Sequence, residues 1–160
     1  MAASNMALGF AEASDAVCLA LLARDLIEVG LGWGYRPNRI AALIHDPETV
    51  TLVARDRTRP VGFAVMRFGD ERAHLILLAV QRAHQRRGLG REMIAWLLQS
   101  ARVAGMTSIH VELRASNAPA LSFYRAMDFS ETFRVPGYYR GRETAVRMIR
   151  MFKMPNGHPS

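Results

Sequence analysis

The chain has 160 residues, of which 50% are hydrophobic and 22% charged, and these values are typical of a single globular domain with one sizeable core. They exclude a chain that is mainly disordered. No apolar run reaches the roughly 18 residues of a membrane-spanning helix, and residues 1–5 lack the layout of a signal peptide, so we expect a cytoplasmic protein without membrane association.

The net charge is +7, and every basic residue except Lys153 is an arginine. Such a surface attracts polyanions, including nucleic acids and phosphorylated cofactors. The arginines are scattered along the chain, however, apart from the group formed by Arg82, Arg86, Arg87 and Arg91. Because no aromatic stripe or helix-turn-helix pattern accompanies them, we expect no direct nucleic-acid role.

The single cysteine, Cys18, lies among apolar residues and is interpreted as a small core residue. His45, His74 and His84 have no carboxylate or cysteine companions at metal-ligand spacing. We therefore assign no metal site.

The first half of the chain predicts a strand, two helices and three strands, with approximate bounds 7–11, 15–29, 37–44, 49–55, 61–68 and 73–80. The first helix is indicated by apolar residues at helical spacing between Val17 and Val29, after a possible cap at Ser14. The last strand is apolar at nearly every position from Leu75 on. It should therefore be buried on both faces, in the centre of a sheet.

A segment rich in glycine and aromatic residues, 30–37, joins the two helices. It is either a simple interhelical loop or a rim on which Trp33 and Tyr35 grip a substrate. The sequence leaves both interpretations open.

The second half predicts a helix, a strand, a helix and two strands, with approximate bounds 93–104, 107–114, 117–127, 129–134 and 143–152. This order favours a mixed α/β (α+β) fold, with a mostly antiparallel central sheet of about seven strands and helices on both faces. We expect one domain over residues 1–154 and a disordered tail over residues 155–160.

The segment Gln85-Arg86-Arg87-Gly88-Leu89-Gly90-Arg91 joins an apolar strand to a helix. Two glycines one residue apart permit positive φ and close approach of a ligand to the main chain. The N-terminus of the next helix offers unpaired N–H groups and partial positive charge, and three arginines add full charges. This pattern predicts a pyrophosphate-binding loop.

In the strand 107–114 the residues alternate, which places His110 and Glu112 on one face, about 7 Å apart. A polar pair on a covered strand is costly unless it has partners or a purpose. Glu112 is therefore a candidate proton acceptor, or it pairs with Arg114 or with an arginine on a helix.

The segment from Gln85 to Gly90 matches the Q/R-x-x-G-x-G/A signature of the GNAT acetyltransferase superfamily. The run from Val111 to Tyr124 resembles the second half of that domain, and it is especially similar to the ribosomal-protein alanine N-acetyltransferases, the RimI-like branch. Arg134 and the pair Tyr138-Tyr139 are similar to the C-terminal pattern of this branch. Two departures are Arg82, where the family often has proline, and Asp128 in place of the usual glycine before Phe129. Aspartate tolerates left-handed geometry better than most residues, so the turn should survive.

The resemblance implies a splayed GNAT-type sheet and acetyl-CoA (coenzyme A) as cofactor. It implies that the main chain of one strand and the side chain of Asn117 hold the pantetheine arm, and that the glycine loop holds the pyrophosphate. Together with Tyr124, the implied cofactor-binding residues are Leu78, Ala79, Val80, Arg86, Arg87, Gly88, Leu89, Gly90, Arg91, Asn117 and Tyr124. Asn117 is also a good helix N-cap, and both roles are compatible.

The resemblance also implies Tyr124 as general acid for the departing thiolate and Glu112 as general base for the attacking amine. The alternatives are a tyrosine that only packs against the core, and His110 or water as the base.

The implied activity is transfer of acetyl to a primary amine by direct attack on the thioester, with no covalent enzyme intermediate. The expected acceptor is a protein N-terminal α-amine, such as that of a ribosomal protein. A small amine (amino acid, polyamine or antibiotic) and a non-catalytic acyl-CoA-binding module are alternatives, and we expect a monomer or homodimer.

Overall fold

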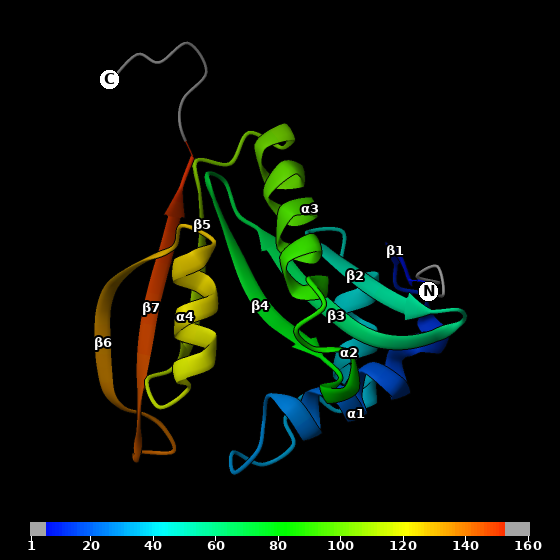
Figure 1. The fold of residues 1–160 in the computed structure, drawn as a ribbon, viewed down its shortest axis with the longest axis horizontal. Helices are drawn as coiled ribbons and strands as arrows, with labels where there is room; N and C mark the ends of the chain where they lie inside the picture. Colours follow the sequence, from blue (N-terminus) through cyan, green and yellow to red (C-terminus); the bar gives the residue numbers. More distant parts are fainter. Residues whose placement is uncertain (1–5, 153–160) are drawn as a thin grey trace. The chain divides into compact units, whose positions relative to one another are not determined.

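The computed structural model describes residues 6–152, so the predicted tail at 155–160 lies outside the described residues. The elements, drawn in Figure 1, are the strands β1 (Met6–Phe10), β2 (Thr49–Asp56), β3 (Arg59–Phe68), β4 (Arg72–Val80), β5 (Ser108–Arg114), β6 (Ser130–Tyr139) and β7 (Glu143–Met151), the helices α1 (Ala16–Leu26), α2 (Pro37–His45), α3 (Leu89–Val103) and α4 (Ala118–Ala126), and the 3-10 turns η1 (Ala13–Asp15) and η2 (Arg82–His84). Their order confirms the predicted succession of strands and helices.

The strands form one seven-stranded sheet in the order β1-β2-β3-β4-β5-β7-β6. The pairs β1–β2, β2–β3, β5–β7 and β6–β7 are antiparallel, and β4–β5 is parallel. The mixed α/β, mostly antiparallel fold is therefore confirmed, and so is the central position of β4.

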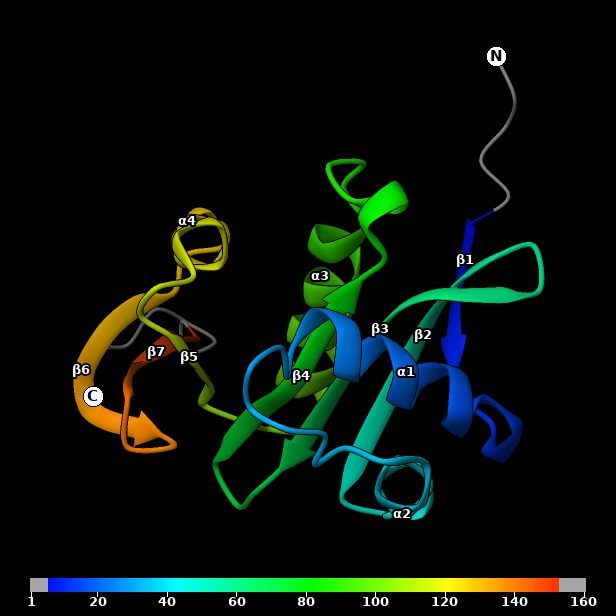
Figure 2. The ribbon, with the colours of Figure 1, turned by 90° about the horizontal axis from the view of Figure 1, so that it is seen from below.

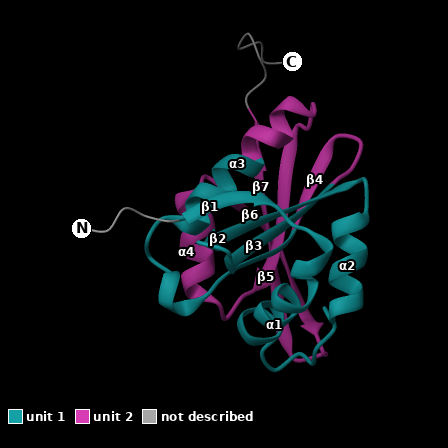
Figure 3. Cartoon of the chain, turned by 90° about the vertical axis from the view of Figure 1, so that its right-hand side faces the viewer, with its two compact units in different colours: residues 1–67, 76–97 teal, residues 68–75, 98–160 magenta. Residues whose placement is uncertain are grey.

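The chain divides into two compact units, shown in Figure 3: a first unit of residues 1–67 and 76–97, and a second unit of residues 68–75 and 98–160. The boundary falls within β3, within β4 and within α3. The expectation of one domain over residues 1–154 stays a prediction.

In the first unit, α1 and α2 lie together and share a core with β2, β3 and β4 (Figure 2). The buried stripe of α1 consists of small residues and one leucine, namely Ala16, Leu19, Ala20 and Ala23. The apolar series that indicated this helix does not all face the core, since Val17 is 59% and Val29 57% exposed. The helix also ends at Leu26 instead of residue 29. Alanines allow the helix backbone to approach the sheet closely, while Leu22 and Leu26 are only partly buried at the border of the core.

The strand β4 alternates in burial, which corrects the prediction that both its faces are buried. Leu75, Leu77 and Ala79 are buried, whereas Leu78 and Val80 are only half-buried. Apolar composition therefore does not by itself mean burial on both faces.

In the second unit, α4 lies against one face of β5 and β7 (Figures 1 and 2). The strand β6 is the edge of the sheet and extends to Tyr139, beyond the predicted end at residue 134. Pro136 and Gly137 lie in an irregularity of the β6–β7 register between Val135 and Tyr139. Edge strands tolerate proline because one side of their backbone has no strand to pair with.

A two-pronged ion pair fixes the start of α1 to β2. The guanidinium of Arg55 donates from Nη1 to Oδ1 of Asp15 at 2.8 Å and from Nη2 to Oδ2 at 2.6 Å. Asp15 also accepts from the backbone N–H of Glu12 at 2.7 Å. The hydrogen bonds from Arg55 hold the pKa of the buried Asp15 carboxyl below its usual value, although burial acts in the opposite direction.

We predict that Asp15→Asn lowers the free energy of unfolding by about 2 kcal/mol at pH 7, because it removes a charged hydrogen-bond acceptor of Arg55. Since the folded-state pKa of Asp15 is depressed, its contribution is present above the unfolded pKa of about 3.9 and is lost as the pH falls further. Urea unfolding at pH 7 and at pH 3 tests this. Asp25→Asn is the control, because its pair with Arg24 is exposed and its loss should have no measurable effect. An equal destabilisation of Asp15→Asn at both pH values would contradict the prediction.

Candidate active site

The segment between β4 and α3 is anchored by hydrogen bonds within the first unit. The backbone N–H of Gln81 donates to Val61 O at 2.7 Å, and the side chain of Gln85 donates to Val80 O at 2.8 Å. His84 is buried, and its Nε2 lies 3.2 Å from Oδ2 of Asp56. The residues that lead into the predicted pyrophosphate loop are therefore fixed to the sheet.

The loop itself uses left-handed backbone at Arg86, with φ of 62°, and at Gly88, with φ of 80°. A Cβ at position 88 would meet nothing within 4 Å, so glycine is required there by conformation and not by space. Gly90 lies in the first turn of α3, so of the two glycines only Gly88 uses the positive φ that glycine permits.

The first turn of α3 presents its backbone donors at this loop. Glu92 N donates to Gly88 O at 2.9 Å, so the N–H groups of Leu89, Gly90 and Arg91 precede the first helical hydrogen bond. The side chains of Arg86, Arg87 and Arg91 are exposed. This combination of backbone donors and guanidinium groups suits a phosphate or pyrophosphate.

In the second unit, Asn117 caps α4. Its Oδ1 accepts from the backbone N–H of Ala120 at 3.2 Å, so the N-cap role is observed. The oxygen is thereby engaged, and the amide nitrogen is the group that could donate to a ligand.

Tyr124 lies on the buried side of α4, and only 6% of it is exposed. Its ring packs edge-on against Phe123 at 5.2 Å and Phe129 at 5.3 Å between centroids. Burial raises the pKa of the Tyr124 hydroxyl well above its usual value, so the phenol holds its proton at neutral pH. Tyr124 therefore packs against the core, and its protonated hydroxyl is also in the state that a general acid requires.

Asp128 closes the turn after α4 in the left-handed conformation that its position predicts, with φ of 66°. Phe129 N donates to Tyr124 O at 2.9 Å, and Arg150 donates to Met127 O at 2.6 Å. The turn therefore survives without glycine and places Phe129 against Tyr124.

Glu112 has a partner that the sequence did not indicate. It faces Arg147 across the β5–β7 ladder, and Arg147 Nε donates to Glu112 Oε2 at 2.6 Å. The suggested partner Arg114 instead lies 3.4 Å from Glu143. No local pattern could reveal Arg147, because the pair depends on the register between two strands that are far apart in the sequence.

Two tyrosines of β6 complete the surroundings of Glu112. A hydrogen bond to Glu112, and then its negative charge, raise the pKa of Tyr138. Burial, with the charge of Glu112 as the second cause, raises the pKa of Tyr139 to about 12. Both phenols are therefore neutral at pH 7.

His110, the other candidate base, lies beside different groups. Its Nε2 is 3.1 Å from Ser108 Oγ, and its ring centroid is 5.3 Å from that of His74 on β4. Burial, and then the charges of His74 and Arg72, lower the pKa of His110, which keeps this imidazole neutral at pH 7.

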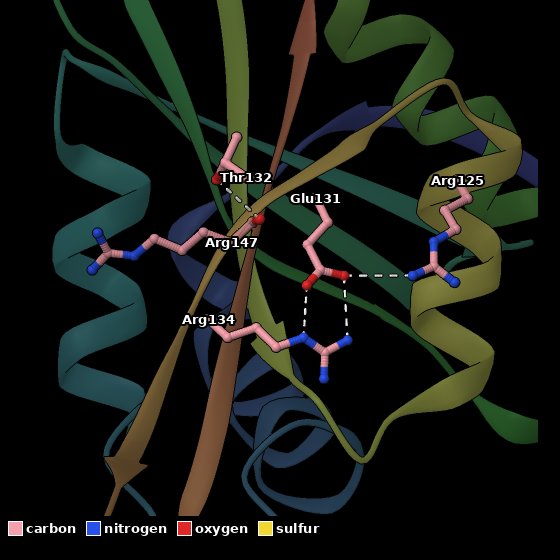
Figure 4. A network of polar contacts seen from close by, with 5 residues as sticks. All are labelled: Arg125, Glu131, Thr132, Arg134 and Arg147. Atoms are coloured by element: carbon pink, nitrogen blue, oxygen red, sulfur yellow. Dashed lines mark hydrogen bonds and ion pairs between the residues drawn. The ribbon is translucent and has the colours of Figure 1, made fainter.

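A second polar cluster fastens β6 to its neighbours, as Figure 4 shows. Glu131 accepts from Arg134 at 2.6 and 3.3 Å and from Arg125 of α4 at 3.5 Å. Thr132 donates to the backbone carbonyl of Arg147 at 3.1 Å. The side chain of Arg147 points away from Glu131.

The aromatic loop between α1 and α2 is anchored in the first unit. Trp33 Nε1 donates to Ala20 O and to Tyr35 O, both at 3.1 Å, and Glu28 accepts from the backbone of Gly34 and Tyr35. Both rings are half-buried against the core. These contacts favour the interpretation as an interhelical loop over that of a gripping rim.

The chain belongs to the acetyltransferase (GNAT) family, which it matches over residues 21–129. It is 35% identical over 100 residues to the [ribosomal protein bS18]-alanine N-acetyltransferase of Salmonella typhimurium, an alignment that covers 61% of this chain and 66% of the relative. It is 26% identical over 108 residues to the N-alpha-acetyltransferase MAK3 of Arabidopsis thaliana, covering 65% and 57%. Each alignment therefore spans less than two thirds of the relative.

Solved structures show the same fold. The ribosomal-protein-S18-alanine N-acetyltransferase from Escherichia coli superposes with a TM-score of 0.83 at 23% identity, covering 97% of this chain and 99% of that one. The acetyltransferase yncA from Salmonella typhimurium, solved with acetyl-CoA, gives a TM-score of 0.80 at 21% identity, covering 98% and 99%.

These findings confirm the predicted family, its likeness to the RimI-like branch and the GNAT fold. The relatives are named as N-acetyltransferases and yncA is solved with acetyl-CoA, in agreement with the predicted acyltransferase class and cofactor. Within residues 6–152, no helix is long and apolar enough to span a membrane.

We predict that Gly88→Ala weakens acetyl-CoA binding at least tenfold, because φ of 80° is strained for alanine by about 1 to 2 kcal/mol and the loop would relax away from it. Titration calorimetry with acetyl-CoA measures the effect.

Gly105→Ala is the matched control, since Gly105 has φ of 84° and equally open space but ends α3 away from this loop. Both variants should lose similar stability, and only Gly88→Ala should lose affinity. Equal affinities of the two variants would contradict the assignment of the loop.

Proposed function

We propose that this chain is an acetyl-CoA-dependent N-acetyltransferase that acts on the α-amine of a protein N-terminus, such as that of a ribosomal protein. We also propose that it works in the cytoplasm as a monomer or homodimer. The observation that carries the proposal is the second unit, in which a buried, protonated Tyr124 on α4 and a partly exposed Glu112 on β5 are both held by defined contacts. The names of relatives in the ribosomal-protein alanine and N-alpha classes support this choice of acceptor.

For the cofactor, we assign the main chain of Leu78, Ala79 and Val80 and the amide of Asn117 to the pantetheine arm. The loop from Arg86 to Arg91 is assigned to the pyrophosphate. The exposed arginines and the free first turn of α3 support the assignment of the loop. Bound acetyl-CoA supplies a thioester whose carbonyl an amine can attack.

The proton transfers are assigned to two side chains of the second unit. An N-terminal amine is mostly protonated at neutral pH, so Glu112 accepts a proton from it at its carboxylate, directly or through water. Tyr124 holds a proton at its hydroxyl and gives it to the departing thiolate. The ammonium nitrogen loses two protons before it becomes a neutral amide: Glu112 accepts the first, and the second leaves the tetrahedral intermediate and restores, through solvent, the proton that Tyr124 gave to the thiolate. The products are a neutral amide and a neutral thiol, and Glu112 releases one proton to solvent.

A peptide panel tests the acceptor. We expect acetylation of peptides with a free N-terminus, alanine first among them, and no acetylation of N-terminally blocked peptides that contain lysine. Mass spectrometry identifies the acetylated nitrogen. Transfer only to amino acids, polyamines or antibiotics would favour the small-amine alternative, and cofactor binding without transfer would favour the non-catalytic module.

A second test concerns the acid. Tyr124→Phe should lower kcat by about a hundredfold, which is typical of the loss of one general acid, with little change in the Kd of acetyl-CoA. Steady-state kinetics and calorimetry measure the two values. Tyr35→Phe is the control, because the Tyr35 ring packs in the α1–α2 loop of the first unit and its activity should not change. Unchanged turnover in Tyr124→Phe would remove Tyr124 from the mechanism.

A further inference from the structure

One row of side chains crosses three strands of the second unit. Glu112 on β5 is the register partner of Arg147 on β7, and Arg147 is the register partner of Phe133 on β6. In β5 this is the face opposite the buried Val111 and Leu113. The row is open to solvent, since the side chain of Arg147 is 42% exposed and that of Glu112 28% exposed.

Arg147 is held on two sides within this row. Its Nε donates to Oε2 of Glu112 at 2.6 Å, and its guanidinium carbon lies 4.9 Å from the centre of the Phe133 ring. Tyr138 hydrogen-bonds Glu112 as well. A planar guanidinium that rests on an aromatic ring loses less freedom when it binds a carboxylate than a mobile side chain would. It can therefore fix the orientation of that carboxylate.

We propose that Arg147 is a positioning residue that orients Glu112 for proton transfer from the acceptor amine. The inference rests on the proposed function, because it takes Glu112 as the base. Arg147 engages Oε2 through Nε, which fixes the plane of the carboxylate that receives the proton. Phe133 acts through Arg147 by keeping the guanidinium in place.

The main alternative is that the pair serves stability alone. Partly exposed ion pairs usually contribute little to stability, and the β5–β7 ladder already joins these strands over seven residue pairs. The two interpretations differ in kinetics. If Arg147 positions Glu112, its removal should lower kcat. It should not raise the acceptor KM, because the positive charge of Arg147 opposes the approach of an acceptor ammonium.

The test is a double-mutant cycle with Arg147→Ala, Glu112→Gln and the double variant, using a free-N-terminus peptide and acetyl-CoA. We expect Arg147→Ala to lower kcat about tenfold without a rise in acceptor KM, and to cause no further loss in the Glu112→Gln background, since residues that act as a unit are not additive. Arg147→Lys keeps the charge but loses the Nε donor, and it should recover part of the activity. The Kd of acetyl-CoA should stay the same throughout.

Arg134→Ala is the matched control, because Arg134 makes an exposed pair with Glu131 at the same distance of 2.6 Å in the same unit (Figure 4). It should keep wild-type kcat, and the melting temperature of every variant is measured to separate folding from kinetics. If Arg147→Ala lowers the melting temperature, kcat is compared between Arg147→Lys and wild type, and a kcat below wild type in Arg147→Lys supports the inference. Wild-type kcat in both Arg147→Lys and the folded fraction of Arg147→Ala overturns it.

The outcomes separate the inference from the proposed function. Wild-type kcat in Arg147→Ala, together with a large loss in Glu112→Gln, overturns the role of Arg147 and leaves Glu112 as the base. Wild-type kcat in Glu112→Gln overturns the base itself, and the inference with it. The inference is also overturned if the fold-losses in kcat of Arg147→Ala and Glu112→Gln multiply in the double variant. A loss of kcat in Arg134→Ala as large as that in Arg147→Ala overturns it too.

Discussion

The two-residue period of β5 is the constraint on which the second unit depends. Ile109, Val111 and Leu113 are buried, so the residues between them must project from the other face. That requirement places Glu112 opposite Arg147 and His110 beside His74. A shift of the register by one residue would bury the carboxylate without its partner, and the cost of burying an unpaired charge makes such a shift unfavourable.

Both ends of the helix α4 are fixed by specific residues. Asn117 caps its first turn, and Asp128 closes its last turn in a left-handed conformation. Between them Tyr124 is held by the rings on either side, and burial keeps its phenol protonated. The chemical roles proposed for Asn117 and Tyr124 therefore fall on residues that also hold α4 in place.

Much of this could be predicted from the sequence, because it depends on local patterns. The alternation in β5, the cap at Asn117 and the turn at Asp128 each follow from a few adjacent residues. The buried face of α1, the half-open face of β4 and the length of β6 could not be predicted, since each depends on which neighbour covers the element. Arg147 was missed for the same reason, because only the pairing of β5 with β7 brings it to Glu112. The roles of the cofactor residues remain predictions.

The edge strand β6 has a consequence for solubility. An exposed edge with free backbone groups is a template for strands of other molecules, and such contacts lead to aggregation. Here the edge carries the charged pair of Glu131 and Arg134, and Pro136 lies at an irregularity that interrupts the regular ladder. Charge and proline in this position hinder the docking of a foreign strand. These features therefore protect a protein with an exposed Phe133 from joining sheets with its own copies.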